Sequence, residues 1–166
     1  MGMELYYLDR ATYRHKHTAE VHDDLIDLFG EFYLVPEGGT NLLAIKGAEE
    51  IVKGIEQDYD YYLAAVGTAG TVTGIISGLN NMGKAIGIAV LKGDFHTEEV
   101  SNWLKKLNKQ NLNNWEINNQ HHFGGYAKFN DELVNFINNF KEKYKVPLDP
   151  IYTGKMMFAF LHLMLY

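Results

Sequence analysis

Two uninterrupted apolar runs constrain the fold of this chain more than any other feature. Residues 61–66 and 85–91 are almost wholly apolar and carry no alternating polar face. Such strands are typical of parallel sheets that are covered on both faces. Amphipathic helical patterns flank them at residues 41–55, 71–79 and 97–107. Strands that alternate with helices in this way predict an α/β fold, with a mostly parallel sheet between layers of helices.

Weaker patterns predict further elements. Thr40, Thr97 and Asn130 are residue types that cap helix N-termini, and each precedes a helical pattern. The last helix is apolar nearly all round, so we expect it to be buried. The remaining predicted elements are strands at residues 5–8, 32–35 and 115–117 and helices at residues 23–29, 130–144 and 154–166.

Composition excludes several classes of protein. The 166 residues, 46% hydrophobic and 22% charged, suit one globular domain or one domain with an appendage. A net charge of −6 argues against a nucleic-acid partner. The absence of cysteine excludes disulfides and thiolate metal sites. No apolar run approaches a membrane span, and residues 1–5 lack a signal-peptide pattern, so we expect a cytoplasmic protein without a membrane partner.

The loop Gly67-Thr68-Ala69-Gly70-Thr71 carries the clearest chemical signal. It follows a buried strand and opens a helix, where backbone N–H groups and the helix dipole favour an anion. The threonine hydroxyls add further donors. A tight turn with small residues for packing explains the same spacing equally well. The loop is neither a Gly-x-Gly-x-x-Gly nor a Walker motif, which argues against dinucleotides and nucleoside triphosphates.

Four segments stand out together when they are taken in chain order. They are Pro36-Glu37-Gly38-Gly39-Thr40-Asn41, Gly67-Thr68-Ala69-Gly70-Thr71, Gly124-Gly125-Tyr126 and Asp149-Pro150-Ile151-Tyr152-Thr153-Gly154-Lys155. In this order they resemble the family of 1-aminocyclopropane-1-carboxylate deaminase and D-cysteine desulfhydrase, pyridoxal-phosphate enzymes with the fold of the tryptophan synthase β subunit. The resemblance covers nearly the whole chain, and its last motif is the most specific.

The resemblance implies a role for each segment. Pyridoxal phosphate is the implied cofactor, with Tyr152 at its ring and Thr153 facing its pyridine nitrogen. Deaminases of the cyclopropane substrate carry glutamate at the Thr153 position, so threonine favours desulfhydrase-like chemistry. Tyr126 matches a tyrosine that contacts substrate, and Ala127 stands where the family usually has glycine. The cofactor phosphate would lie at Gly67, Thr68, Ala69, Gly70 and Thr71, and the substrate loop would comprise Glu37, Gly38, Gly39 and Thr40.

The family's Schiff-base lysine lies in a Gly-Gly-Asn-Lys setting that this sequence lacks. By the resemblance, residues 1–36 would end the family's small domain and residues 37–166 would form part of its large cofactor-binding domain. We therefore expect the C-terminal portion of the enzyme, trimmed at both ends, with no normal catalysis by this chain alone. Lys155 is interpreted as structural rather than as a substitute for that lysine.

The substrate class implied is a small amino acid, D-cysteine or 1-aminocyclopropane-1-carboxylate, giving an α-keto acid and ammonia. Apolar surfaces left by missing segments predict a homodimer or other self-association. Two alternatives stay open: a truncated, non-catalytic family member and an unrelated phosphate-binding α/β module. His15, His17 and His22 have no fixed spacing to a fourth ligand, so we expect no metal site.

Overall fold

The computed structural model describes residues 2–164, and the chain divides into two compact units, Met1–Val35 and Pro36–Tyr166. The first unit holds helices α1 (Arg10–Arg14) and α2 (Ala19–Phe29). The Asp9 carboxylate caps α1, and the Thr18 hydroxyl caps α2. Gly30, at a φ of 75°, ends α2, as the sequence predicted. The assignment of residues 1–36 and 37–166 to two family domains stays a prediction.

The strands predicted at residues 5–8 and 32–35 are wrong, because both segments lack regular secondary structure. Their apolar residues are largely exposed; Tyr7, for example, is 82% exposed and Tyr33 is 69% exposed. A short apolar run becomes a strand only where a neighbouring strand completes its hydrogen bonds. Within the described residues, neither segment pairs with a strand of the sheet.

The second unit is built on three parallel strands, β1 (Tyr61–Val66), β2 (Lys84–Ala89) and β3 (Trp115–Asn118), in the order β1-β2-β3. Tyr61 pairs with Lys84, and Ala85 pairs with Trp115. A short 3₁₀ turn precedes the first helix of this unit. The turn and helices are Glu37–Gly39, α3 (Leu42–Lys53), α4 (Gly70–Leu79), α5 (His96–Lys106), α6 (Asp131–Tyr144) and α7 (Thr153–Met164).

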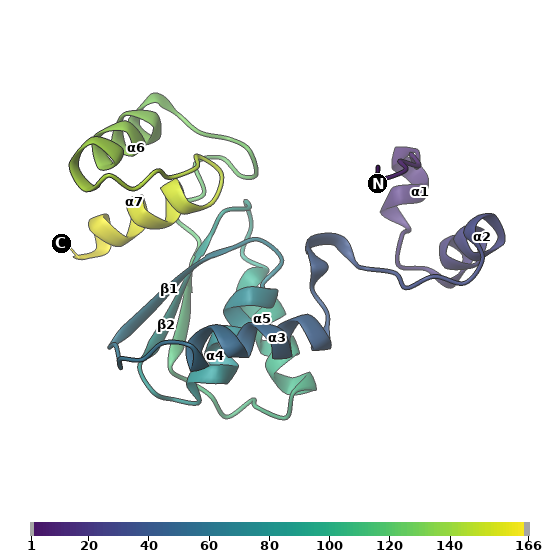
Figure 1. Cartoon of the computed structure of the whole chain (residues 1–166), viewed down its shortest axis with the longest axis horizontal. Coiled ribbons are helices and arrows are strands. Elements are labelled where there is room, and N and C mark those ends of the chain that lie inside the picture. The colour runs from purple at the N-terminus through teal and green to yellow at the C-terminus, as the bar shows by residue number, and fades with distance from the viewer. Residues whose placement is uncertain (1, 165–166) are drawn as a thin grey trace. The chain divides into compact units, whose positions relative to one another are not determined.

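Helices cover both faces of this sheet, which confirms the predicted α/β class. Within this unit, α3, α4 and α5 lie on one side of the strands, and α6 and α7 lie on the other (Figure 1). Both α4 and α7 pack against β1 and β2. The main core lies under α4 and α5. Its fully buried members include Val66, Val72, Ile76, Leu79 and Val100.

Two predicted helix caps are wrong and one is confirmed. The Asn130 side chain accepts the N–H of Leu133 at 3.0 Å and caps α6. Thr40 does not cap α3; that cap is Asn41, whose side chain accepts the N–H of Ala44 at 2.8 Å. Thr97 lies inside α5, which begins without a side-chain cap.

Helix α7 is less buried than its composition predicted. Lys155 and Ala159 are fully buried, whereas Leu163 is 45% exposed. The helix thus covers the sheet with one face, and its other apolar residues are half-buried. The predicted residues 165 and 166 of this helix lie outside the described residues. In the part of the chain that the structure describes, no helix combines the length and apolar character that crossing a membrane requires.

Candidate functional site

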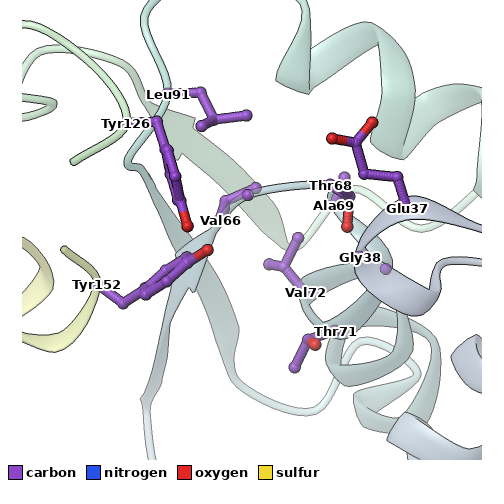
Figure 2. Close-up of a pocket in the computed structure, with 13 residues that line it drawn as sticks. Glu37, Gly38, Val66, Thr68, Ala69, Thr71, Val72, Leu91, Tyr126 and Tyr152 are labelled. Atoms are coloured by element: carbon purple, nitrogen blue, oxygen red, sulfur yellow. The ribbon is translucent and has the colours of Figure 1, made fainter. Parts of the chain in front are cut away.

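A cavity of about 640 Å³ opens beyond the last residues of β1 and β2. This is the edge at which parallel α/β sheets bind their ligands, since the loops that follow the strands meet there. Figure 2 shows two tyrosines on one side of the cavity and the loop after β1 on the other. The lining residues are Glu37, Gly38, Ala65, Val66, Gly67, Thr68, Ala69, Gly70, Thr71, Val72, Leu91, Tyr126 and Tyr152.

The loop after β1 presents a helix N-terminus to this cavity. Ala69 is the N-cap of α4 in a left-handed conformation, with a φ of 63°, and no side chain caps the helix. The first N–H groups of a helix have no partner inside it and carry partial positive charge. Thr68 and Thr71 are exposed and add hydroxyl groups to the same wall. This arrangement suits a phosphate or another anion without a basic side chain.

A second loop packs against the first. The Thr40 and Thr68 hydroxyl groups are hydrogen-bonded at 2.7 Å. A Cβ at Gly38 would lie 2.5 Å from the Thr68 Oγ1, and a Cβ at Gly70 would lie 2.6 Å from the Thr40 Oγ1. Glycine at these positions is therefore required for close packing. These contacts support the packing interpretation of the loop. The anion-binding interpretation is compatible with this packing and stays a prediction, because the first residues of α4 still line the cavity.

Tyr126 and Tyr152 form the aromatic wall of the cavity. Their ring centroids lie 6.3 Å apart at an interplanar angle of 66°. Their hydroxyl groups point toward each other in Figure 2. Burial, followed by the hydrogen bond and charge of Tyr126, raises the pKa of the Tyr152 hydroxyl above its usual value. The two tyrosines thus meet in one cavity with Thr68, although they come from separate segments of the sequence.

Asp149 fixes the segment that carries Tyr152. Its carboxylate accepts the N–H groups of Ile151 at 2.8 Å and of Tyr152 at 2.6 Å. It also accepts both the N–H and the hydroxyl of Thr153. Partial burial acts to raise the pKa of Asp149, but these four hydrogen bonds outweigh it and hold the pKa at about 2.

The loop of residues 122–127, which contains Tyr126, has a strained backbone. Phe123 and Ala127 both adopt a φ of 54°, and Gly124 and Gly125 between them also have positive φ. Ala127 therefore takes a left-handed conformation that glycine adopts without strain. The turn thus forms with alanine at the position where the resemblance led us to expect glycine.

The structure gathers nine of the twelve predicted site residues around the cavity. They are Glu37, Gly38, Gly67, Thr68, Ala69, Gly70, Thr71, Tyr126 and Tyr152. Gly39, Thr40 and Thr153 do not line it. Thr40 acts on Thr68 through its hydroxyl, and the Thr153 hydroxyl is paired with Asp149. The functional roles of all twelve residues stay predictions.

Other lining residues were missed by sequence reasoning. Ala65 and Val66 end β1, Val72 lies in the first turn of α4, and Leu91 follows β2. The sequence could have indicated these residues only through their position near the carboxyl ends of the predicted strands, because they belong to no chemical motif. Lys155, which we interpreted from the sequence as a structural residue, does not line the cavity.

Comparison with curated proteins finds relatives along most of this chain. A Pyrococcus horikoshii protein assigned as a 1-aminocyclopropane-1-carboxylate deaminase is 26% identical over 159 residues, covering 89% of this chain and 49% of the relative. A Pyrococcus furiosus protein of the same assignment is 29% identical over 163 residues, covering 89% and 50%. The mitochondrial bifunctional D-cysteine desulfhydrase/1-aminocyclopropane-1-carboxylate deaminase of Arabidopsis thaliana is 27% identical over 150 residues, covering 78% and 36%.

These relatives confirm the resemblance that the motifs predicted. The chain spans about half the length of the two Pyrococcus relatives. No family model matches the chain. Among solved structures, the crystal structure of an ACC deaminase homologue matches with a TM-score of 0.73 at 24% identity, covering 96% of this chain and 53% of that one. This match confirms the predicted fold, a mostly parallel sheet between helical layers.

Proposed function

From its similarity to the 1-aminocyclopropane-1-carboxylate deaminases and D-cysteine desulfhydrases, we propose that this chain is the C-terminal portion of a pyridoxal-phosphate-dependent enzyme. The substrate is a small amino acid, D-cysteine or 1-aminocyclopropane-1-carboxylate, and the products are an α-keto acid and ammonia. A cytoplasmic location, expected from the sequence, is part of this proposal. The observation that carries it is the joining of an uncapped helix N-terminus and two tyrosines in one cavity.

The donor set of the cavity fits the cofactor. The N–H groups at the start of α4, with the hydroxyls of Thr68 and Thr71, would hold the phosphate. Tyr152 and Tyr126 would contact the ring and the substrate. Bound pyridoxal phosphate supplies a conjugated ring that withdraws electrons from bonds at the amino acid α-carbon. The resemblance implies that Thr153 faces the pyridine nitrogen, but Thr153 does not line the cavity and its hydroxyl is paired with Asp149, so we assign it no contact with the ring.

A second candidate function is a family member that binds phosphate-bearing ligands without turnover. One observation favours it: Lys155 is fully buried among backbone carbonyls and does not reach the cavity. Neither lysine nor arginine is among the lining residues. We therefore expect residues 1–166 alone to bind pyridoxal phosphate without forming a keto acid from D-cysteine.

The proposal is tested by titrating the chain with pyridoxal phosphate and with inorganic phosphate in a calorimeter. Thr71→Val removes one hydroxyl from the phosphate site and leaves the shape of the side chain unchanged. Losing a hydrogen bond to a charged group costs about 1.5–3 kcal/mol, so both affinities should fall by about 10-fold or more.

Thr97→Val is the matched control, because Thr97 is likewise the second residue of a helix, is exposed, and lies outside the cavity. Its affinities should equal those of the native chain. Equal affinities in all three proteins would show that ligands bind elsewhere, and an absence of binding to the native chain would contradict the proposal.

A further inference from the structure

Lys155 is the largest fully buried side chain of the described residues. Its Nζ donates to the carbonyl oxygens of Gly125 at 2.8 Å and His122 at 2.9 Å, with the Val90 carbonyl at 3.5 Å. An ammonium has three protons and no acceptor, so three carbonyls match its donors. A lysine is rarely fully buried without such partners. Burial lowers its pKa, and the charge of Asp149 opposes that shift.

These three carbonyls belong to two segments that otherwise lie apart in the sequence. Val90 immediately follows β2, and His122 and Gly125 lie in the strained loop of residues 122–127, which contains Tyr126. Lys155 itself lies on α7, three residues after Tyr152. One ammonium therefore connects the end of β2, the loop of one cavity tyrosine and the helix next to the other.

A strained loop such as this one keeps its conformation only where other contacts hold it in place. Two non-glycine residues, Phe123 and Ala127, hold positive φ values there. Such conformations cost about 1–3 kcal/mol each and persist only where the surroundings impose them. The loop supplies two backbone hydrogen bonds of its own, from Gly125 to His122 and from Lys128 to Gly125. Lys155 bonds to the same two carbonyls, so it holds the turn at both ends.

We propose that Lys155 is a positioning residue of the cavity, whose buried ammonium fixes the Gly125 carbonyl and thereby holds Tyr126 against Tyr152. The inference rests on the proposed function only where it assumes that Tyr152 and Tyr126 contact the cofactor ring and the substrate. The positions of the two tyrosine rings do not depend on any ligand. Without the ammonium, the buried carbonyls of Val90 and Gly125 and the partly buried carbonyl of His122 each lose a donor, and the strained loop relaxes away from α7. Tyr152 then loses the neighbour that helps to raise its pKa.

The test follows the titration of Tyr152 in chains whose tyrosines carry ¹³C at Cζ. Tyr126→Phe and Tyr152→Phe assign the two signals among the 11 tyrosines. In the native chain Tyr152 should titrate above the usual tyrosine range. In Lys155→Met, which keeps an unbranched side chain without the ammonium, its pKa should shift back down toward about 10. Circular dichroism should show that the helices remain.

Restoring an ammonium at position 155 distinguishes a role of Lys155 in positioning Tyr126 from a role in stability alone. Because the sequence has no cysteine, Lys155→Cys creates a single thiol. Alkylating it with 2-bromoethylamine in denaturant, then refolding, restores an ammonium at nearly the length of lysine, whereas iodoacetamide gives a neutral control. The aminoethylated protein should recover the native Tyr152 titration, and the neutral adduct should not. A Tyr152 titration that is unchanged in folded Lys155→Met, or is restored equally by both adducts, overturns the proposal.

If the variants fail to fold, the native chain still provides a test. The ¹⁵N signal of the Lys155 ammonium should show scalar coupling across hydrogen bonds to the carbonyl carbons of His122 and Gly125. A rapidly exchanging ammonium without these couplings contradicts the proposal. None of these measurements uses pyridoxal phosphate, so failure of the cofactor to bind would leave the Lys155 result standing, and the converse also holds.

Discussion

The hydroxyl groups of Thr40 and Thr68 are hydrogen-bonded at 2.7 Å, although 28 residues separate them in the sequence. Thr40 follows the Glu37–Gly39 turn, and Thr68 follows β1. The bond joins the predicted substrate loop to the predicted phosphate loop. It also places Thr40 against Gly70, the first residue of α4, where no room remains for a Cβ.

We predict that Gly70→Ala destabilises the chain because of Thr40. An added Cβ would lie 2.6 Å from the Thr40 Oγ1 and 3.1 Å from its Cγ2. Overpacking of this kind costs about 1–3 kcal/mol, against the gain of up to about 1 kcal/mol that alanine usually gives in a helix. Unfolding in urea should show the loss in the native background and a smaller loss in Thr40→Ala. Additive effects of the two substitutions would contradict direct contact.

Ala127→Gly should stabilise the chain. Ala127 holds a φ of 54°, and an L-residue in the left-handed region costs roughly 1–2 kcal/mol that glycine avoids. The greater freedom of glycine in the unfolded chain offsets part of this gain. We expect a net increase of about 0.5–1 kcal/mol in the free energy of unfolding in urea.

Ala44→Gly is the control with the opposite sign. Ala44 is exposed within α3, where glycine should lower the free energy of unfolding by about 0.5–1 kcal/mol. If both substitutions destabilise the chain equally, the left-handed conformation of Ala127 carries no strain, and the strain of this loop is confined to Phe123.

The sheet of the second unit was predictable because its strands are buried on both faces. Residues 61–66 were predicted to their exact bounds, and β2 and β3 to within two residues. The apolar runs at residues 5–8 and 32–35 were wrongly predicted to be strands, because their composition is that of a strand. They differ from β1 and β2 in having no partner strand, which the sequence does not show. The Thr40 cap failed for a tertiary reason: its hydroxyl is bound to Thr68, and the adjacent Asn41 caps α3 instead.

The site was predictable where its residues sit in motifs. The loop after β1 and both tyrosines meet in the cavity as the resemblance implied. The contacts of Thr153 and Lys155 were not predictable in the same way. The Thr153 hydroxyl is paired with Asp149 of its own motif, and the Lys155 ammonium is bound to three backbone carbonyls, a kind of contact that a motif of side chains does not show. No spacing rule in the sequence shows that a lysine near a helix start turns inward to a loop 30 residues earlier.

Asp149 should make stability depend on pH in acid. Its folded pKa is about 2 against an ordinary value of 3.8, because hydrogen bonds favour the carboxylate despite partial burial. The contribution is therefore complete above pH 3.8 and is lost as the pH falls through 2. Asp149→Asn should be less stable than the native chain at pH 7, and the gap should narrow between about pH 4 and pH 2.

Urea unfolding at a series of pH values measures this gap. Asp58→Asn, in the loop before β1, controls for the loss of one negative charge. A gap between Asp149→Asn and the native chain that stays constant down to pH 2 would show that the Asp149 hydrogen bonds do not depend on its ionisation.

We predict that the chain self-associates through the outer face of α3. Leu43 and Ile51 lie eight residues apart in α3 and are 69% and 50% exposed, and Ile55, two residues beyond the end of α3, is 37% exposed. Gly47, between them, has open space at its Cβ position. Exposed apolar faces of this kind mark association surfaces. Sedimentation velocity should show a weight-average mass that rises with protein concentration.

Charge on that face should restore the monomer. Ile51→Lys adds a cation to each copy of the surface, so two copies repel and lose apolar contact. Met82→Lys is the control, because Met82 is also exposed, at 62%, but lies in the turn before β2. We expect Ile51→Lys to remain at the monomer mass over the concentrations at which the native chain and Met82→Lys associate. A native chain that stays monomeric throughout would contradict the prediction. Equal loss of association in both variants would instead show that the contact lies away from α3. The edge strand β1 is one such place, because in the described part of the sheet it has a neighbouring strand on one side only.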